Sequence, residues 1–211
     1  MTVLETIRAR ILSGELSSGA WLKDSVLATE LGTSRAPVRE ALERLVQSGL
    51  VTKSLNRPYQ VVTIDAAALS ELRLLRFADE SAAIMHLVLT RTPLDGLEAP
   101  LAEMARLTAA GADWVSLVDA DLAFHRELVA ATGLPRMLSR FDGITDQIRT
   151  WLGGLEVPPI VVGTQLQRHL ELRDTLVGCQ AGQDVRPAIR LWEAHLLGDH
   201  RASAFWADDP R

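Results

Sequence analysis

Four side chains in the second half of the chain have the chemistry of metal ligands: Asp121, His125, His169 and His195. Asp121 and His125 are four residues apart, so on a helix their side chains share one face. Imidazole nitrogen and carboxylate oxygen are usual donors to zinc and other first-row divalent ions, and such a set could leave positions open for water or a small acid. The same spacing is common in purely structural helices, so the residues alone leave both interpretations open.

Two arginines near the start of the chain have the spacing of a DNA-reading helix. Arg35 and Arg39 are four apart and fall on one face, whereas apolar residues at helical spacing form another face: Ala41, Leu42, Leu45 and Val46. Arginine suits the paired acceptors of guanine, and the second helix of a helix-turn-helix presents its N-terminal residues to base edges. The alternative is a plain helical hairpin with solvated arginines.

The elements that must position these arginines are predicted within residues 3–64. Residues 26–48 form two short helices around Gly32, with Thr33 or Ser34 as a hydroxyl cap for the second helix and Pro37 in its first turn. An amphipathic helix precedes them, starting near residue 3. Two β-rich runs, 50–54 and 59–64, follow as a hairpin, so the sequence predicts a winged helix-turn-helix.

From residue 65 onward, apolar residues recur at three- and four-residue steps, with Gly or Pro at the breaks. This pattern predicts six helices near 66–90, 94–110, 113–131, 134–152, 159–179 and 184–205, with the last break at 178–183. The expected fold is mainly α, with an N-terminal winged helix-turn-helix over 1–64 and a C-terminal antiparallel helical bundle over 65–211.

Composition agrees with this division. Residues 1–64 hold eight Lys/Arg and six Asp/Glu, whereas residues 65–211 hold fourteen and twenty-one, so only the first part is suited to meet phosphates. No apolar run reaches 18 residues and no signal peptide is evident, so we expect a soluble, cytoplasmic protein with no membrane contact. The single Cys179 forms no internal disulfide and is given no redox role.

The segments ILSGELSSGAWL, LATELGTSRAPVREALERLVQSGLV and NRPYQV resemble the N-terminal domain of GntR-family bacterial transcription regulators, over residues 3–64. The resemblance implies that the two arginines contact bases or nearby phosphates in the major groove and that Thr33 and Ser34 hold the DNA backbone. It also implies that the wing tip reaches toward the minor groove. The implied DNA-binding residues are Thr33, Ser34, Arg35, Arg39, Asn56 and Arg57. Many family members carry glycine in the wing where this chain has 56–58, NRP.

Three later segments, DADLAFHRELVAATG, RHLELRDTL and LWEAHL, resemble the FCD type of effector domain found in the FadR-like subfamily. The resemblance implies an effector-binding and dimerisation domain over 65–211 and a divalent metal ion, zinc first with nickel or manganese as alternatives. Its implied ligands are Asp121, His125, His169 and His195. The interval between the last two is longer than usual, which we attribute to the GCQAGQ loop, with a shifted helix register as the alternative.

Arg76, in ELRLLRFADESAA, resembles the family's arginine that points into the ligand cavity, where it could clamp the carboxylate of an effector. The alternative is a surface arginine paired with Glu80 four residues later. His86 and His200 are expected to lie outside the metal site. Tryptophans such as Trp192 could line the cavity, although the core is their commoner place.

Together these features predict a ligand-responsive DNA-binding transcription regulator that is not an enzyme. It would be a repressor, a homodimer on a palindromic operator in double-stranded DNA, with a small organic acid sensed at the metal site. Two other interpretations stay open: a metal-dependent hydrolase, and a DNA-binding dimer whose helical body is only structural. The sequence shows none of the features that would support a hydrolase: an evident general base, a His-Glu-x-x-His motif, a Gly-rich phosphate loop or a Gly-x-Ser-x-Gly turn.

Overall fold

The computed structural model describes residues 1–55, 57–152 and 159–198. These residues form two compact units: the first contains 1–69 and 142–152, and the second contains 70–141 and 159–198. The boundary at residue 64 stays a prediction. Asn56, His200 and the end of the predicted last helix lie outside the described residues.

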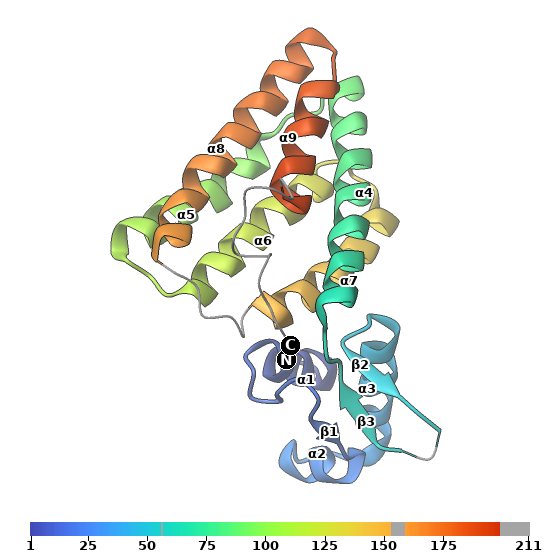
Figure 1. Ribbon diagram of the computed structural model, residues 1–211. Coiled ribbons are helices and arrows are strands. Elements are labelled where there is room, and N and C mark those ends of the chain that lie inside the picture. Colours follow the sequence, from blue (N-terminus) through green and yellow to red (C-terminus); the bar gives the residue numbers. More distant parts are fainter. Residues whose placement is uncertain (56, 153–158, 199–211) are drawn as a thin grey trace. The chain divides into compact units, whose positions relative to one another are not determined.

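Three helices form the core of the first unit (Figure 1): α1 (Val3–Leu12), α2 (Asp24–Glu30) and α3 (Arg35–Gln47). Thr2 and Glu5 form a capping box at the start of α1, in which the Glu5 N–H donates to Thr2 Oγ1 over 3.2 Å. Apolar residues of all three helices and of the following strands are buried together: Ile7, Ile11, Leu27, Val38, Leu42, Leu45, Leu50 and Val61. The predicted helix-turn-helix therefore has its own core.

The turn between α2 and α3 depends on Gly32, whose φ of +61° lies in the left-handed region that favours glycine. Ser34 is the N-cap residue of α3 in backbone conformation, but its side chain makes no capping hydrogen bond. The predicted serine cap was therefore wrong. One physical cause is Pro37 at the third helical position, which lacks an N–H and so removes one of the two donors that an N-cap hydroxyl usually accepts from.

A small antiparallel sheet completes the first unit, with the strand order β1-β3-β2. Its strands are β1 (Trp21–Leu22), β2 (Val51–Lys53) and β3 (Tyr59–Val61), and Lys53 pairs with Tyr59. The predicted hairpin is confirmed as β2 and β3, with shorter strands. Strand β1 was not predicted, because a two-residue strand that pairs with β3 far along the chain leaves no local pattern.

The helices α4 to α9 make the body of the structure mainly α, as predicted. Their bounds are α4 (Ala66–Thr90), α5 (Glu98–Ala110), α6 (Trp114–Ala130), α7 (Pro135–Leu152), α8 (Pro159–Gly182) and α9 (Arg186–Leu197), with a short 3-10 turn, η1 (Asp95–Leu97), before α5. Within the described residues, none of these helices is both long and apolar enough to cross a bilayer.

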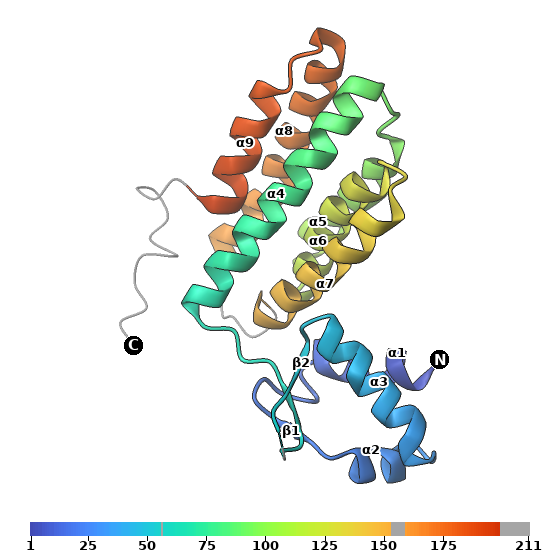
Figure 2. The same cartoon turned by 90° about the vertical axis from the view of Figure 1, so that its right-hand side faces the viewer.

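The second unit is built around one apolar core to which α4, α5, α6, α8 and α9 contribute. Its largest members are Phe124, Trp192, Leu87, Leu97, Met104 and Leu176. Figures 1 and 2 show α9 beside α4, and the Arg73 Nε–H of α4 donates to the Leu196 carbonyl of α9 over 2.6 Å. Five helices thus converge on the region that holds the predicted metal ligands.

Helix α8 is longer than predicted, because it continues through the expected break to Gly182. Cys179 is buried in the core, and Gln180 Nε2 donates to the carbonyls of Leu87 at 3.0 Å and Thr92 at 2.8 Å. These tertiary contacts hold the last turn helical despite Gly178. The extra length between His169 and His195 therefore lies in a helix, not in a loop.

Candidate metal centre and DNA-binding face

The structure brings together the four predicted metal ligands. Helix α6 carries Asp121 and His125, α8 carries His169 and α9 carries His195, and their ligand atoms all lie within 4.8 Å of one another. His125 Nε2 is 3.1 Å from His195 Nε2 and 3.2 Å from His169 Nε2. His169 Nε2 is also 3.0 Å from Asp121 Oδ1. The four-residue spacing on α6 thus places two donors on one side of the cluster.

The hydrogen bonds on the far side of two imidazoles assign their tautomers. His125 Nδ1 lies 2.5 Å from Glu80 Oε2, and His169 Nδ1 lies 2.8 Å from the Gln165 backbone carbonyl. Both partners are acceptors, so in the neutral form of each ring, which is the form that binds metal, Nδ1 carries the proton and Nε2 presents a lone pair.

Two lone pairs that face each other across 3.2 Å repel unless positive charge lies between them. Nitrogen ligands held 2.0–2.1 Å from zinc in a tetrahedral site are about 3.3 Å apart, close to the separations found here. The donor set and its spacing therefore fit a first-row divalent ion.

The charges of the cluster also suit metal binding. Burial, followed by the charge of Arg76, holds the pKa of His125 below its usual value. Burial and the neighbouring His125 and His169 hold the pKa of His195 well below its usual value. Burial raises the pKa of Asp121, but the hydrogen bond and charge of His169 outweigh burial and bring that pKa far below its usual range. Neutral imidazoles and an ionised carboxylate are the forms that bind metal.

Glu80 contacts the cluster, a position that the sequence analysis did not predict. It is fully buried, and besides its contact with His125 it accepts hydrogen bonds from Arg76 Nε at 2.7 Å and Trp192 Nε1 at 2.6 Å. Burial raises the pKa of Glu80, but the charges and hydrogen bonds of His125 and Arg76 bring it below its usual value. A signal was present, since Ala83, Ile84 and Leu87 place Glu80 on the apolar face of α4.

Arg76 lies inside the protein and not on its surface. The pairing with Glu80 that the alternative interpretation predicted is present, but the surface location that it gave Arg76 is wrong, because Arg76 is only 6% exposed. Arg76 Nη2 is buried, has no hydrogen-bond partner among the described residues, and lies 3.6 Å from Asp121 Oδ2. This donor therefore borders the ligand cluster, forms an ion pair with Asp121, and is available to donate a hydrogen bond to an anionic group.

The other histidine and the tryptophans lie at different places relative to the cluster. His86 is partly buried on α4 and does not belong to the cluster, as expected. Trp192 belongs to the core and, through Glu80, to the surroundings of the cluster. Trp151 is half-buried near the end of α7, in the part of that helix that groups with the first unit.

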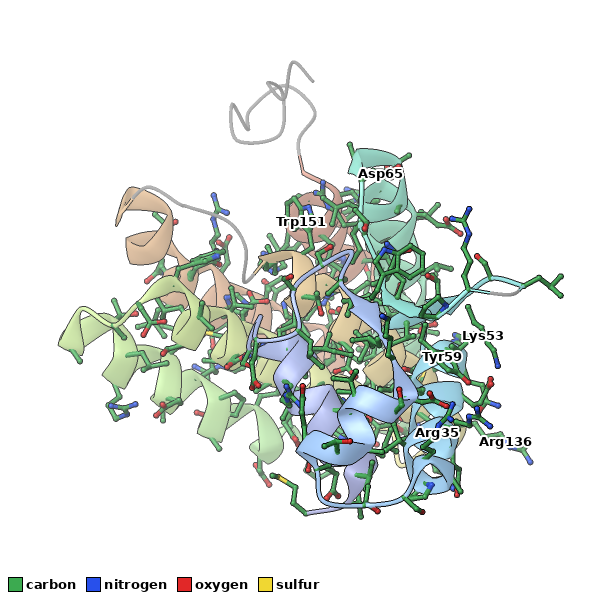
Figure 3. The ribbon with its side chains drawn as sticks, turned by 90° about the horizontal axis from the view of Figure 1, so that it is seen from below. Arg35, Lys53, Tyr59, Asp65, Arg136 and Trp151 are labelled. Atoms are coloured by element: carbon green, nitrogen blue, oxygen red, sulfur yellow. The ribbon has the colours of Figure 1, made fainter. Side chains whose placement is uncertain are left out.

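The predicted DNA-contacting arginines lie at the start of α3, with 57% of the Arg35 side chain and 58% of the Arg39 side chain exposed. Ser34 and Arg57 are exposed and Thr33 is half-buried. In the wing, Lys53 Nζ donates to Tyr59 Oη over 3.0 Å, and the two side chains are adjacent in Figure 3. Basic side chains thus occur on both α3 and the wing.

An exposed basic helix in a winged helix-turn-helix, followed by a helical unit with a buried polar cluster, defines a class of DNA-binding transcription regulators. Residues 1–61 match the family of bacterial regulatory proteins called the gntR family, and residues 71–197 match the FCD domain. The chain therefore belongs to the GntR-family regulators that carry an FCD domain, and it is not an enzyme.

Individual relatives agree with this assignment. An HTH-type transcriptional regulator of Streptomyces ambofaciens is 32% identical over 129 residues, which are 60% of this chain and 53% of that protein, so the match spans about half of the relative. The regulator McbR of Escherichia coli (strain K12) is 23% identical over 185 residues, covering 87% of this chain and 83% of McbR.

Solved structures show the same fold. A GntR transcriptional regulator from Rhodococcus sp. RHA1 superimposes with a TM-score of 0.76 at 25% identity, covering 94% of this chain and 97% of that one. The E. coli protein McbR/YncC gives a TM-score of 0.73 at 21% identity, with 92% of each chain covered.

Proposed function

We propose that this protein is a cytoplasmic, ligand-responsive repressor that binds a palindromic operator as a homodimer and senses a small organic acid at a metal site. The observation that supports the sensor most directly is the cluster of Asp121, His125, His169 and His195 beside Arg76, whose buried Nη2 makes no hydrogen bond to a described residue. Membership of the GntR family supports the DNA-binding part.

The acid is proposed from the charges around the cluster. The four ligands would hold a divalent ion, zinc first with nickel or manganese as alternatives, which supplies positive charge to bind a carboxylate oxygen. Arg76 Nη2 would hold the other carboxylate oxygen, because a buried guanidinium donor without a hydrogen bond is costly and an anion within hydrogen-bond distance satisfies it. A small acid that touches both would link α4 to α6, α8 and α9.

For the DNA side we propose the contacts that the sequence predicts: Thr33, Ser34, Arg35, Arg39, Asn56 and Arg57. The exposure of both arginines and of Arg57 supports this proposal, and so does the Ser34 hydroxyl, which makes no capping bond. For Asn56 the support is the sequence alone. Two copies related by a two-fold axis would require an operator with the same symmetry.

Elemental analysis of the purified protein, combined with a thermal-shift screen of small carboxylic acids with and without chelator, tests the sensor. We expect about one metal ion per chain and at least one acid that raises Tm only in the metal-loaded protein. H125A should lose the metal, whereas H86A, which changes a histidine outside the cluster, should keep it. If the wild type holds no metal and chelator has no effect, Asp121 and the three histidines are structural and the proposed metal-dependent sensor is wrong.

A further inference from the structure

A single carboxylate holds both predicted DNA-reading arginines. Asp24 Oδ1 and Oδ2 accept hydrogen bonds from Arg35 Nη2 at 2.9 Å and 3.0 Å, and Asp24 Oδ2 also accepts from Arg39 Nε. The side chain of Asp24 is only 14% exposed, whereas both guanidiniums are more than half exposed. The carboxylate thus lies beneath two cations that face solvent.

Asp24 is well placed to remain charged in this position. It is the first residue of α2, where the helix dipole favours an anion. Burial raises the pKa of Asp24, but the hydrogen bonds and charges of Arg39 and Arg35 outweigh burial and bring that pKa below its usual value.

The geometry leaves the base-reading donors of both arginines free. Arg39 is held through Nε, and no hydrogen bond within the described residues occupies its two Nη groups. Arg35 is held through Nη2, and no hydrogen bond within the described residues occupies its Nε or its Nη1, each of which is available for a single contact. Guanine presents O6 and N7 as neighbouring acceptors, and a bidentate contact needs two donors of one guanidinium in a fixed direction. In Arg39 the two Nη groups lie on one edge, and the carboxylate that holds Nε supplies that direction.

We infer that Asp24 is a positioning residue for DNA sequence recognition, which presents Arg35 and Arg39 to the bases as one preorganised pair. This inference rests on the proposed function, in which these arginines contact DNA. Asp24 itself faces away from the bases, and its effect would be on the discrimination between sequences more than on the attraction to phosphates.

Preorganisation and simple charge neutralisation make opposite predictions. If Asp24 only neutralises the arginines, its removal strengthens binding to every DNA sequence, because one negative charge near the phosphates is lost. If Asp24 positions the arginines, its removal weakens binding to the preferred sequence while binding to other sequences stays equal or becomes stronger. The ratio of the two affinities separates these cases.

The experiment uses the full-length protein and a DNA site selected by the wild type from a randomised pool. Fluorescence anisotropy measures Kd for that site and for a scrambled duplex. Loss of a well-directed bidentate contact should lower the specificity ratio of D24N and D24A by about tenfold. D24E keeps the carboxylate and should retain part of the ratio, and circular dichroism verifies that each variant is folded.

E30Q is the matched control, since Glu30 is another carboxylate of α2 but pairs with Arg10. It changes the charge as D24N does and should leave the specificity ratio unchanged. A ratio in D24N and D24A equal to that of E30Q would overturn the inference.

The variants R35A and R39A separate a failure of the positioning role of Asp24 from a failure of the proposed base contacts of the arginines. If at least one of them lowers the ratio but the Asp24 variants do not, only the positioning role of Asp24 fails. If neither lowers the ratio, the proposed base contacts of these arginines are wrong, and the inference fails with them.

Discussion

Glu80 determines how His125 faces the other metal-ligand candidates. As an acceptor at 2.5 Å from Nδ1, it directs the proton to that nitrogen and leaves Nε2 for the cluster. The carboxylate is satisfied by three donors from three side chains, so its burial without solvent is tolerated. One residue of α4 therefore orients a ligand on α6 and is itself fixed by Trp192 of α9.

The variant E80Q should bind the metal more weakly than the wild type. Its amide offers one oxygen in place of two and adds an NH2 group that cannot accept from any of the three donors, so His125 loses its fixed orientation. Loss of such a partner typically lowers metal affinity by about 10- to 100-fold, which competition with a chromophoric chelator would measure.

The control for this variant is E103Q, because Glu103 is a carboxylate paired with an arginine, Arg106, on the exposed side of α5. E103Q should bind metal as the wild type does. Wild-type metal affinity in E80Q would contradict the orienting role of Glu80.

At the scale of the element, α6 is the helix on which the cluster depends most, because it carries two of the four proposed ligands. It begins with Asp113 as its N-cap, whose side chain accepts from the Ser116 N–H at 2.9 Å. The apolar face of α6 then buries Phe124 and Leu128 in the core. The cap and the core face together set the rotation of the helix, and this rotation directs Asp121 and His125 to the same side.

The variant D113A should lower Tm by about 2–4 °C in a thermal unfolding experiment followed by circular dichroism, because the first turn of α6 loses its cap. D113N, which retains a capping oxygen, should stay near the wild type. The cap holds the pKa of Asp113 below its usual value, so the difference between wild type and D113A should shrink as the pH falls through that lowered pKa. An unchanged Tm in D113A would show that packing alone determines the start of α6.

At the scale of the whole molecule, the proposed DNA contacts and the proposed acid site belong to different compact units. Regulation then requires that binding at one site change the affinity at the other. Thermodynamic linkage demands that this effect be reciprocal, whatever the path between the units.

The acid identified by thermal shift should therefore weaken DNA binding by about 5- to 150-fold, and saturating DNA should weaken acid binding by the same factor. Two titrations, one by fluorescence anisotropy and one by calorimetry, measure the two factors. H125A serves as the control, since it should bind DNA without a response to the acid. An acid that binds the metal-loaded wild type and leaves its DNA affinity unchanged would contradict the proposed repressor.

Much of this protein follows from local sequence patterns. Apolar residues at helical spacing located α4 and α7, and alternating β-rich runs located the wing hairpin. The four-residue interval between Asp121 and His125 placed both on one helix face without any knowledge of the bundle. These features depend on residues a few positions apart, whose relation is set by the geometry of a single helix or hairpin.

Only the tertiary structure decided how distant segments meet. The added length of α8, held by contacts of Cys179 and Gln180 with other elements, still brings His195 within reach of His125. The alternative interpretation placed Glu80 on the surface as the partner of Arg76. In the structure Glu80 is buried, and it is the acceptor that orients His125. Such outcomes depend on packing between residues far apart in the chain. Periodicity along one helix can place a side chain on the buried face, but it does not tell which groups of the neighbouring helices that side chain will meet.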